Sequence, residues 1–388
     1  MKRLLIAAAA VVALAVVAVF AFGPALIEGA ANRVLPGPRR EAGAAAKELH
    51  AKLFVADLHA DALLWRRDLL ERGTRGHVDL PRLVEGGVAL QVFSAVTKSP
   101  AGQNYDHNRS DATDALSALV VVQGWPPRTW TSLFERARYQ ADKLRDFSAR
   151  SRGRLRIIES KGDLRRFAAE RRADPSLTAG LLAIEGMHAM QGDLQNLDAL
   201  RAAGFRMMGI THFFDNELGG SVHGDKKEGL TDLGRAAVRR MEETGVTVDL
   251  AHASPQVIRD VLAMATKPVV VSHTGVRGTC DHVRNLDDEQ IRGVAATGGL
   301  IGIGYWDAAV CDVDVKGIVA ALLYGARLVG ADHVALGSDF DGGTETPFDT
   351  GGIPLLTEGL LAAGTSEGDV RRIMGENVLR VLQQNLPE

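Results

Sequence analysis

Short apolar runs alternate with amphipathic segments of helical period over most of this 388-residue chain. The runs are nearly continuous in apolar residues, which is typical of parallel strands covered by helices on their outer face. Eight runs are predicted as strands: residues 52–58, 88–96, 179–185, 205–211, 245–251, 267–272, 299–305 and 333–339. Eight strand-helix units over about 330 residues predict an α/β fold, a closed (β/α)8 TIM-like barrel.

The helical segments carry start and stop signals that support this division. In residues 230–245, Thr231 or Asp232 is the expected N-cap and Gly245 the expected stop. A second helix is expected to begin with Ser254 as its cap and Pro255 in its first turn. An open doubly wound sheet is the competing fold, but the glycine-rich phosphate loop that it normally carries after an early strand is missing.

Ionisable side chains stand where six of the eight predicted strands end, the face on which barrel enzymes build their active sites. These residues are His59, Asp61, Glu185, His212, His252, His273 and Asp339. A single histidine after an apolar run is usually an ordinary loop residue, but closure of a barrel would bring all of these together. Because residues two apart in an extended segment point to the same side, His59 and Asp61 are able to bind one ion together.

This set of imidazoles and carboxylates exceeds what one tetrahedral zinc ion needs. Two divalent ions that share a bridging carboxylate are the economical arrangement, and such a pair lowers the pKa of a bridging water and polarises a carbonyl. Ligands without thiolate suit zinc, although manganese or cobalt fits the same set. The sequence therefore predicts two Zn²⁺ ions per chain.

Composition and cysteine content exclude other classes of function. A net charge of −3 with scattered basic residues offers no basic face, so no nucleic-acid partner is expected. Cys280 and Cys311 are the only cysteines, too few for a four-cysteine zinc site or a disulfide scaffold. We expect two free buried thiols in preference to a pair.

The N-terminus carries an apolar run from Leu4 to Ile27 that is about long enough to cross a bilayer as a helix. Lys2 and Arg3 precede it and predict a cytoplasmic N-terminus with the rest of the chain exported. We favour an uncleaved anchor over a cleaved signal, which would leave a secreted or periplasmic protein. The expected division is an anchor or signal in residues 1–28, a tether in 29–45 and the catalytic barrel in 46–388.

Seven motifs in order resemble the membrane (renal-type) dipeptidase family, which belongs to the amidohydrolase superfamily of binuclear-zinc barrels. They are DLHAD (57–61), AIEGMHAM (183–190), MGITHFFDNELGGS (208–221), VDLAHAS (248–254), VVVSHTGVRG (269–278), RNLDDEQIR (284–292) and LGSDFDGG (336–343). The resemblance continues to MGENVLRVL at 374–382, so it covers nearly the whole folded chain.

The resemblance implies a role for each metal-binding residue. His59 and Asp61 would hold the first zinc ion, and Glu185 would bridge the two ions. His252 and His273 would hold the second.

The resemblance also implies how substrate is handled. Asp339 would be the acid/base that takes a proton from the bridging water and delivers it to the leaving amine, and His212 would hydrogen-bond the tetrahedral oxyanion. Arg284 would pair with the free carboxylate of the substrate, since a guanidinium fork matches a carboxylate bidentately. In the long segment after the fourth predicted strand, Asn216 is expected to shape the substrate pocket.

Neighbouring polar residues are given structural roles. Asp57 has the right parity to point at the site and either supports a ligand histidine or is buried against a strand backbone. Asp341 is expected to brace the last loop, and His188 to be exposed in a turn. Five histidines are left out because they have no strand-end placement or read as surface residues: His50, His107, His223, His282 and His333.

The predicted function is a zinc-dependent dipeptidase that hydrolyses the peptide bond of dipeptides through a metal-bridging hydroxide. The breadth of the family implies tolerance of D-residues or dehydro residues at the C-terminal position, and its members are commonly dimers, which leaves a homodimer open. One alternative is an N-acyl amino acid amidohydrolase with the same binuclear site. Another is a metal-bearing surface protein without turnover.

Overall fold

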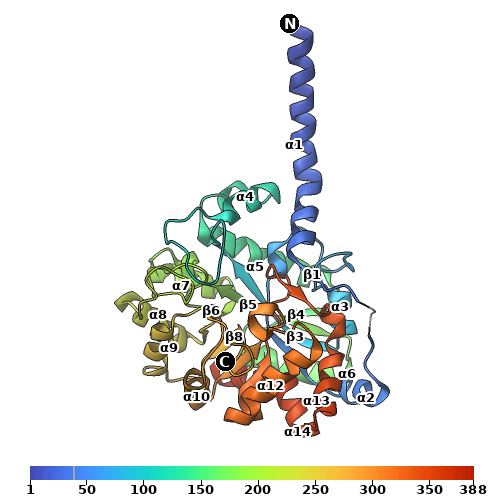
Figure 1. Cartoon of the computed structure of the whole chain (residues 1–388), viewed down its shortest axis with the longest axis vertical. Coiled ribbons are helices and arrows are strands. Elements are labelled where there is room, and N and C mark those ends of the chain that lie inside the picture. Colours follow the sequence, from blue (N-terminus) through green and yellow to red (C-terminus); the bar gives the residue numbers. More distant parts are fainter. Residues whose placement is uncertain (38–39) are drawn as a thin grey trace.

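The computed structural model describes residues 1–37 and 40–388 and shows a barrel from which one long helix projects (Figure 1). The barrel strands are β2 (Val55–Ala60), β3 (Val88–Val96), β5 (Thr178–Glu185), β6 (Phe205–Gly209), β7 (Thr247–Asp249), β8 (Val270–Thr274), β9 (Leu300–Ile303) and β10 (Val334–Leu336). Each pairs in parallel with its neighbours, and the pairing of β3 with β5 closes the ring. The predicted eight-stranded α/β barrel is confirmed.

Three further strands were not predicted. The three-residue strand β4 (Leu155–Ile157) pairs with the first residues of β5, and it is too short and too exposed to give a periodic signal. Outside the barrel, β1 (Arg33–Val34) pairs in parallel with β11 (Glu345–Thr346). The last predicted strand also extends too far, because the chain leaves the ladder after Leu336 whereas the prediction continues to residue 339.

The predicted helix signals are confirmed. In α8 (Asp232–Thr244), the Thr231 side chain accepts from the amide of Gly234, and Gly245 ends the helix at a φ of 77°. In α9 (Pro255–Leu262), the Ser254 side chain accepts from the amide of Val257. The other helices that follow the N-terminal one are α2 (Ala44–His50), α3 (Leu80–Glu85), α4 (Ala115–Val122), α5 (Leu133–Arg150), α6 (Lys161–Ala173), α7 (Leu194–Ala202), α10 (Asp288–Ala296), α11 (Asp307–Val310), α12 (Val315–Val329), α13 (Pro354–Ala362), α14 (Glu367–Arg371) and α15 (Asn377–Asn385).

Apolar side chains of the strands pack against the surrounding helices. One buried cluster joins Leu90 of β3 and Leu181 of β5 to Phe167 of α6 and Leu382 of α15. Burial of such side chains supplies roughly 1.5–3 kcal/mol each and fixes the strand ends that carry the polar residues.

The two cysteines form a disulfide, so the expectation of free thiols is wrong. Cys280 follows β8 and Cys311 ends α11, which follows the adjacent strand β9. Their Cα atoms lie 5.4 Å apart because neighbouring strands direct both loops to the same place. Their separation by 31 positions in the sequence hid this proximity.

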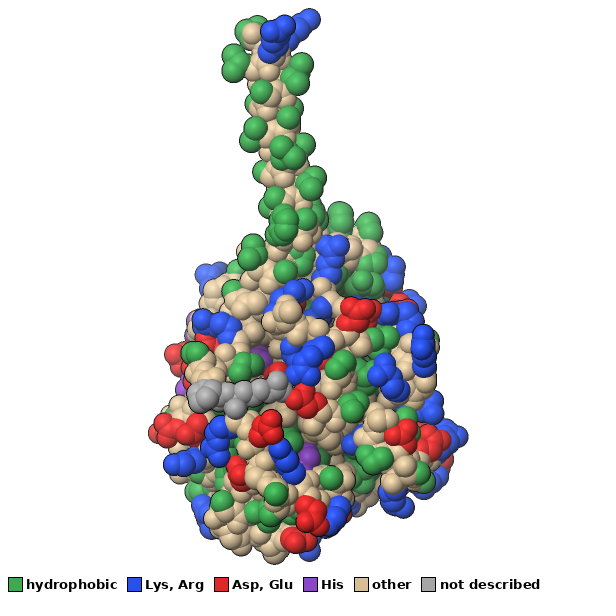
Figure 2. Space-filling model, turned by 90° about the vertical axis from the view of Figure 1, so that its right-hand side faces the viewer, with side chains coloured by type: hydrophobic (Ala, Val, Ile, Leu, Met, Phe, Trp, Pro, Cys, Tyr) green, Lys and Arg blue, Asp and Glu red, His purple; other side chains and the backbone are tan. Residues whose placement is uncertain are grey.

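Helix α1 (Lys2–Ala31) is long and apolar enough to cross a membrane, and none of its most apolar window is buried against the barrel. Figure 2 shows a stem covered with hydrophobic side chains, with Lys and Arg at its tip. At the foot of this helix a charged side chain contacts the barrel. Glu28 is 1% exposed and forms ion pairs with Arg67 (Nε–Oε1 2.5 Å) and Arg75 (Nε–Oε2 2.7 Å).

The segment after α1 also contacts the barrel. The Asn32 side chain accepts from the amide of Gly343 (2.8 Å), and Arg33 pairs with Glu345 beside the β1–β11 ladder. Arg67, which holds Glu28, also pairs with Asp341. The foot of the stem is therefore bonded to the turn that follows β10.

We expect Glu28→Ala to destabilise the protein by about 3 kcal/mol, because two guanidinium groups would lose a buried carboxylate. The full-length protein in detergent, followed by circular dichroism on heating, would show a Tm lowered by several degrees. Glu48→Ala is the matched control, since it removes an exposed pair with Lys52 and should change the Tm little. Equal Tm values for the two variants would contradict the structural role of Glu28.

Candidate active site

The structure brings the seven strand-end residues together at the carboxyl ends of the barrel strands. His59 lies in β2, Glu185 ends β5 and His273 lies in β8, while the others follow β2, β6, β7 and β10 within a few residues. All seven are buried, with Asp339 at 9% the most exposed. Closure of the barrel therefore produces the convergence that the sequence predicts.

Glu185 lies at the centre of the cluster. Its Oε1 is 2.9 Å from His252 Nε2, 3.1 Å from His273 Nε2 and 3.7 Å from His59 Nε2. Its Oε2 is 3.5 Å from His212 Nε2. One carboxylate thus faces four imidazoles that come from four different strands.

The imidazoles turn the same nitrogen inward. The Nε2 atoms of His252 and His273 lie 2.9 Å apart. In a neutral imidazole only one of the two ring nitrogens carries a proton. On the outer side, the Ser272 hydroxyl lies 3.0 Å from Nδ1 of His273 and 3.3 Å from Nδ1 of His59. An outer hydrogen bond of this kind fixes the ring and leaves the Nε2 lone pair free to bind a cation.

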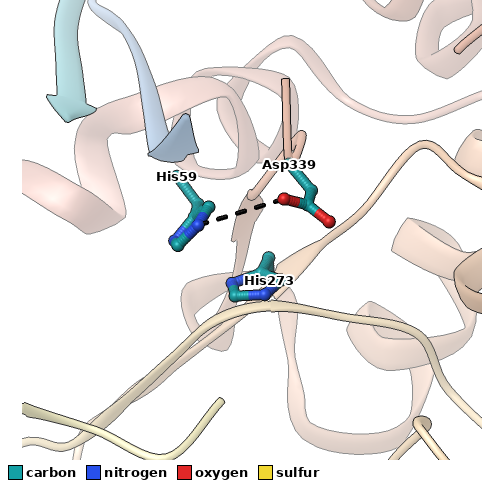
Figure 3. Close-up of side chains that lie close together, drawn as sticks. All are labelled: His59, His273 and Asp339. Atoms are coloured by element: carbon teal, nitrogen blue, oxygen red, sulfur yellow. Dashed lines mark ion pairs between the residues drawn. The ribbon is translucent and has the colours of Figure 1, made fainter. Parts of the chain in front are cut away.

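His59 Nε2 and Asp61 Oδ1, which lie 3.4 Å apart in the cluster, are both buried without a hydrogen-bond partner. Buried polar atoms without a partner are costly in a folded protein. Figure 3 shows His59, His273 and Asp339 around one space, with Asp339 Oδ1 3.9 Å from His59 Nε2. A metal ion at this place would satisfy these atoms.

The ionisable groups perturb one another's pKa values in a way that a bound cation would relieve. Burial raises the pKa of Glu185 well above its ordinary value, and the nearby Asp61 carboxylate adds to the shift. Burial, with Arg284 next in effect, lowers the pKa of His252 well below its usual value. For His59, burial works against protonation, but the carboxylates of Glu185 and Asp61 outweigh it and raise the pKa to about 10. Divalent cations would remove this conflict by favouring ionised carboxylates and neutral imidazoles.

Three groups of possible ligands overlap at shared residues. Within each, the ligand atoms lie within 4.8 Å of one another: His59, His273 and Asp339; Glu185, His212 and His252; His59, Asp61 and Glu185. Because His59 and Glu185 connect the groups, the buried cluster fits a binuclear site for divalent metal.

The turn that carries Asp339 has a strained backbone. Asp339 and Asp341 have φ values of 58° and 64°, in the left-handed region that residues other than glycine rarely adopt. A Cβ on Gly342 would lie 2.0 Å from Asp339 Oδ1, so only glycine leaves room for this carboxylate. The Thr344 hydroxyl donates to the Asp339 carbonyl (2.8 Å) and holds the turn.

Asp57 and Asp341 support the site from outside. Asp57 accepts from the amide (2.9 Å) and the hydroxyl (2.5 Å) of Ser338, and its buried carboxylate thus ties β2 to the segment after β10. Of its two predicted roles, burial against backbone is the one seen. Asp341 accepts from the amides of His77 (2.6 Å) and Val78 (3.2 Å), so it braces the last loop as predicted.

A cavity of about 210 Å³ adjoins the cluster. Its polar wall includes Glu185, Asp339 and Arg284, and its apolar wall includes Leu116 and Leu119 of α4. A larger hollow of about 1400 Å³ lies beside α2, but none of the clustered residues lines it. The smaller cavity is therefore the candidate substrate pocket.

Arg284 lies in this cavity with part of its hydrogen-bonding capacity unused. Its Nη2 donates to the carbonyl of His273 (2.6 Å), while its Nε is buried without a hydrogen-bond partner. The guanidinium carbon lies 5.7 Å from the centre of the Trp306 ring. A buried cation of this kind is ready to receive an anionic group.

Asn216 is not brought to the cavity. Its amide donates to the carbonyl of Ile210 (2.7 Å), and its oxygen accepts from the amide of Leu218 (2.9 Å). Through these hydrogen bonds the Asn216 side chain fixes the conformation of the segment after β6.

Three histidines are buried where the sequence suggested exposed or surface positions. His188 is 4% exposed, and the expectation of an exposed side chain is wrong; burial lowers its pKa to about 3. His50 is also buried and bonds to Thr357 Oγ1 (2.8 Å). His223 stacks on Phe213 with ring centroids 4.5 Å apart and lies 5.2 Å from the His252 ring.

Two aromatic residues at the cavity were also not predicted from the sequence. Trp306 donates from Nε1 to the Tyr105 hydroxyl (3.0 Å), and both line the cavity. The position of Trp306 directly after a predicted strand could have marked it. Tyr105 gave no signal, because it lies in an irregular segment.

A barrel that gathers buried histidines and carboxylates at its strand ends defines a metal-dependent enzyme of the TIM-barrel class. Comparison with known families narrows this class, since the family described as membrane dipeptidase (peptidase family M19) matches residues 43–386. The chain belongs to this family, and the prediction of a metallo-dipeptidase is confirmed at the level of the family.

Individual proteins and a solved structure are also similar to this chain. The chain is 31% identical, over 62% of its own length and 92% of the relative's, to an uncharacterised protein in the pqqA 5′ region of Klebsiella pneumoniae. It is 29% identical to dipeptidase tcpJ of Claviceps purpurea, over 80% of this chain and 69% of the relative. A metallopeptidase structure from Rhodobacter sphaeroides has the same fold, with a TM-score of 0.70 and 24% identity. The match covers 86% of this chain and 99% of the other, which is liganded with a phosphinate mimic of the dipeptide L-Ala-D-Ala.

Proposed function

We propose that this metallo-dipeptidase uses two zinc ions to hydrolyse the single peptide bond of dipeptides. The observation that carries the proposal is the convergence of four imidazoles on Glu185, beside a small cavity that also holds Arg284. When bound, a pair of divalent ions lowers the pKa of a water molecule and polarises a carbonyl group. The donor set, with nitrogen and oxygen and no sulfur, suits zinc.

The proposed ligands divide between two ions. His59 and Asp61 would hold one, and their unpartnered Nε2 and Oδ1 atoms support this. His252 and His273 would hold the other, which their converging Nε2 atoms support. Glu185 would bridge, because its Oε1 faces both sets.

Asp339 is the proposed acid/base. Without a cation, burial raises its pKa to about 8, against the influence of His59. A carboxyl held beside the cluster can serve as a general acid or base. The strained turn and Gly342 hold it beside the cluster. From this place it would take a proton from water and deliver it to the leaving amine.

Arg284 and His212 are the proposed substrate contacts. The free Nε of Arg284 supports pairing with the C-terminal carboxylate of a dipeptide. His212 Nδ1 lies 3.1 Å from the carbonyl of Lys98, an oxygen that only accepts, so in the neutral ring Nε2 carries no proton. Burial lowers the pKa of His212 to about 3. Donation from Nε2 to an oxyanion would therefore require the ring to take up a proton from water, which the negative charge of the oxyanion would favour.

The preferred side chains are small, given the cavity of about 210 Å³. The Rhodobacter sphaeroides relative binds a mimic of L-Ala-D-Ala, which supports inclusion of a C-terminal D-residue among the substrates. The apolar wall formed by Leu116 and Leu119 favours one second candidate, an N-acyl amino acid amidohydrolase, because an acyl chain would fit against it.

We also propose that α1 is an uncleaved anchor for an exported enzyme, with residues 1–28 in or near the membrane and residues 46–388 as the catalytic barrel. The unburied apolar surface of α1 supports this, as do Lys2 and Arg3 at its start. The Cys280–Cys311 disulfide agrees with an oxidising compartment.

The function is tested by assaying full-length protein on dipeptides and, in parallel, on N-acetyl amino acids. We expect dipeptide cleavage that disappears after chelation and returns when Zn²⁺ is added, because the cluster holds the metal. L-Ala-D-Ala and L-Ala-L-Ala should both be tried. Cleavage of only the acylated compounds by metal-loaded protein would select the amidohydrolase instead.

The metal centre is tested with Glu185→Gln. Loss of the bridging carboxylate should lower bound metal from about two ions per chain, measured by mass spectrometry of purified protein after dialysis. Glu217→Gln, at an exposed position, is the matched control and should keep the full amount. Unchanged metal content in Glu185→Gln would refute the bridging role.

Asp339→Asn separates catalysis from metal binding. The amide cannot accept and release the proton, so kcat should fall by about 10²- to 10⁴-fold, while metal content stays near that of the native protein. Asp281→Asn, an exposed carboxylate, provides the control. Normal turnover by the Asp339 variant would remove it from the mechanism.

A further inference from the structure

Helix α4 is an apolar helix whose outer side is only partly covered by other described residues. No charged residue occurs from Ala115 to Pro127. Leu116 and Val120 are buried in a cluster with Trp65, Val96 and Trp125. On the other side Ala115 and Ala118 are exposed, Leu119, Val121 and Val122 are only partly covered, and Trp130 nearby is 42% exposed. Contiguous exposed apolar surface usually marks an interaction site.

Hydrogen bonds from a buried arginine fix the position of α4 on the barrel. Arg136 is almost fully buried and donates to Asp114, the N-cap of α4, at 2.5 Å. It also donates to the carbonyls of Thr97 (2.8 Å) and Trp130 (3.0 Å) and to the hydroxyl of Ser117 (2.8 Å). A guanidinium that uses its donors in this way holds α4 and Trp130 in fixed positions on the barrel.

Helix α4 also touches α1. Val122 Cγ1 lies 3.1 Å from the place that a Cβ on Gly23 would take, and Ala31 packs against the cluster of Leu116. Figure 1 shows α4 on the side of the body from which α1 projects. The apolar side chains of α4 thus continue the apolar surface of α1.

The contact with α1 lies at the depth where a membrane would end. From Leu4 to Gly23 the helix rises about 30 Å, the thickness of the hydrocarbon layer. At this depth Arg66 Nη1 donates to the carbonyl of Phe20 (3.0 Å). That carbonyl has lost its helical donor, because Pro24 has no N–H. A guanidinium at this place belongs at the boundary between lipid and water.

The cavity is lined in part by α4 and in part by the turn that is bonded to the foot of α1. Leu116 and Leu119 line the cavity from α4. Gly343 lines it from the turn after β10, and its amide donates to Asn32 directly after α1. A membrane that meets both helices would therefore lie beside this part of the cavity wall.

We propose that α4 and Trp130 form a second contact with the bilayer, at the level of the headgroups and upper acyl chains, so that the active-site cavity opens at the membrane surface. An uncharged helix lying flat beside a spanning helix fits this environment, and tryptophan prefers it. The inference rests on the proposed anchoring by α1, but not on the proposed reaction.

The test places one environment-sensitive fluorophore at a time in the full-length protein, reconstituted in phosphatidylcholine vesicles. Both native cysteines are paired, so an introduced cysteine is the only free thiol. Ala115→Cys and Ala118→Cys report on α4, and Val11→Cys reports on α1. Ala363→Cys, at the exposed end of α13, is the matched control for a position in water. Circular dichroism confirms that each variant is folded.

The measurement is quenching by nitroxide carried on the lipid chains, compared with quenching by iodide in the water. We expect the α4 probes to be quenched by lipid nitroxide several-fold more than the Ala363 probe and to be protected from iodide. If the Val11 probe is quenched from the lipid while both α4 probes behave like Ala363, the second contact does not exist and the anchor stands. If the Val11 probe is also open to iodide, the anchor fails and the inference fails with it.

Discussion

The ladder between β3 and β5 is the interaction on which the rest of the structure depends. It runs from Leu90–Ala179 to Val96–Glu185 and turns a row of parallel strands into a ring. Only in a ring do β2 and β8, separated by β9 and β10, direct their ends at one another. The His59 and His273 rings, from these two strands, have centroids 3.8 Å apart.

Closure also has a cost, because it buries several ionisable groups in one place. Without a cation, Glu185 and Asp339 hold protons more tightly than usual, and His252 and His273 hold them more weakly. These shifts all reduce the charge of the cluster. A divalent metal that binds the folded chain in preference to the unfolded chain would lower the pKa of the two carboxylic acids, keep the imidazoles neutral and stabilise the barrel, so metal and fold are linked.

Most of the barrel could be predicted from the sequence, because local patterns of apolar residues and helix caps decide where strands and helices form. Apolar runs marked the eight barrel strands, and Thr231 and Ser254 marked helix starts, since both effects are local. The cluster followed from strand ends and a fold that closes. Contacts made by irregular segments could not be predicted in this way. The Cys280–Cys311 disulfide and the stacking of His223 on Phe213 depend on loop paths, which have no period in the sequence.

The foot of α1 and the turn that carries Asp339 belong to one network of ion pairs and hydrogen bonds, although they lie far apart in the sequence. Arg67 pairs with both Glu28, at the foot of α1, and Asp341, in the turn that carries Asp339. The same turn is bonded to Asn32 through Gly343. Because the φ of Asp339 is unfavourable by itself, the surrounding contacts must hold the turn in place. Part of that support comes from residues that follow the apolar helix directly, so the stem contributes to the geometry of the site as well as to its location.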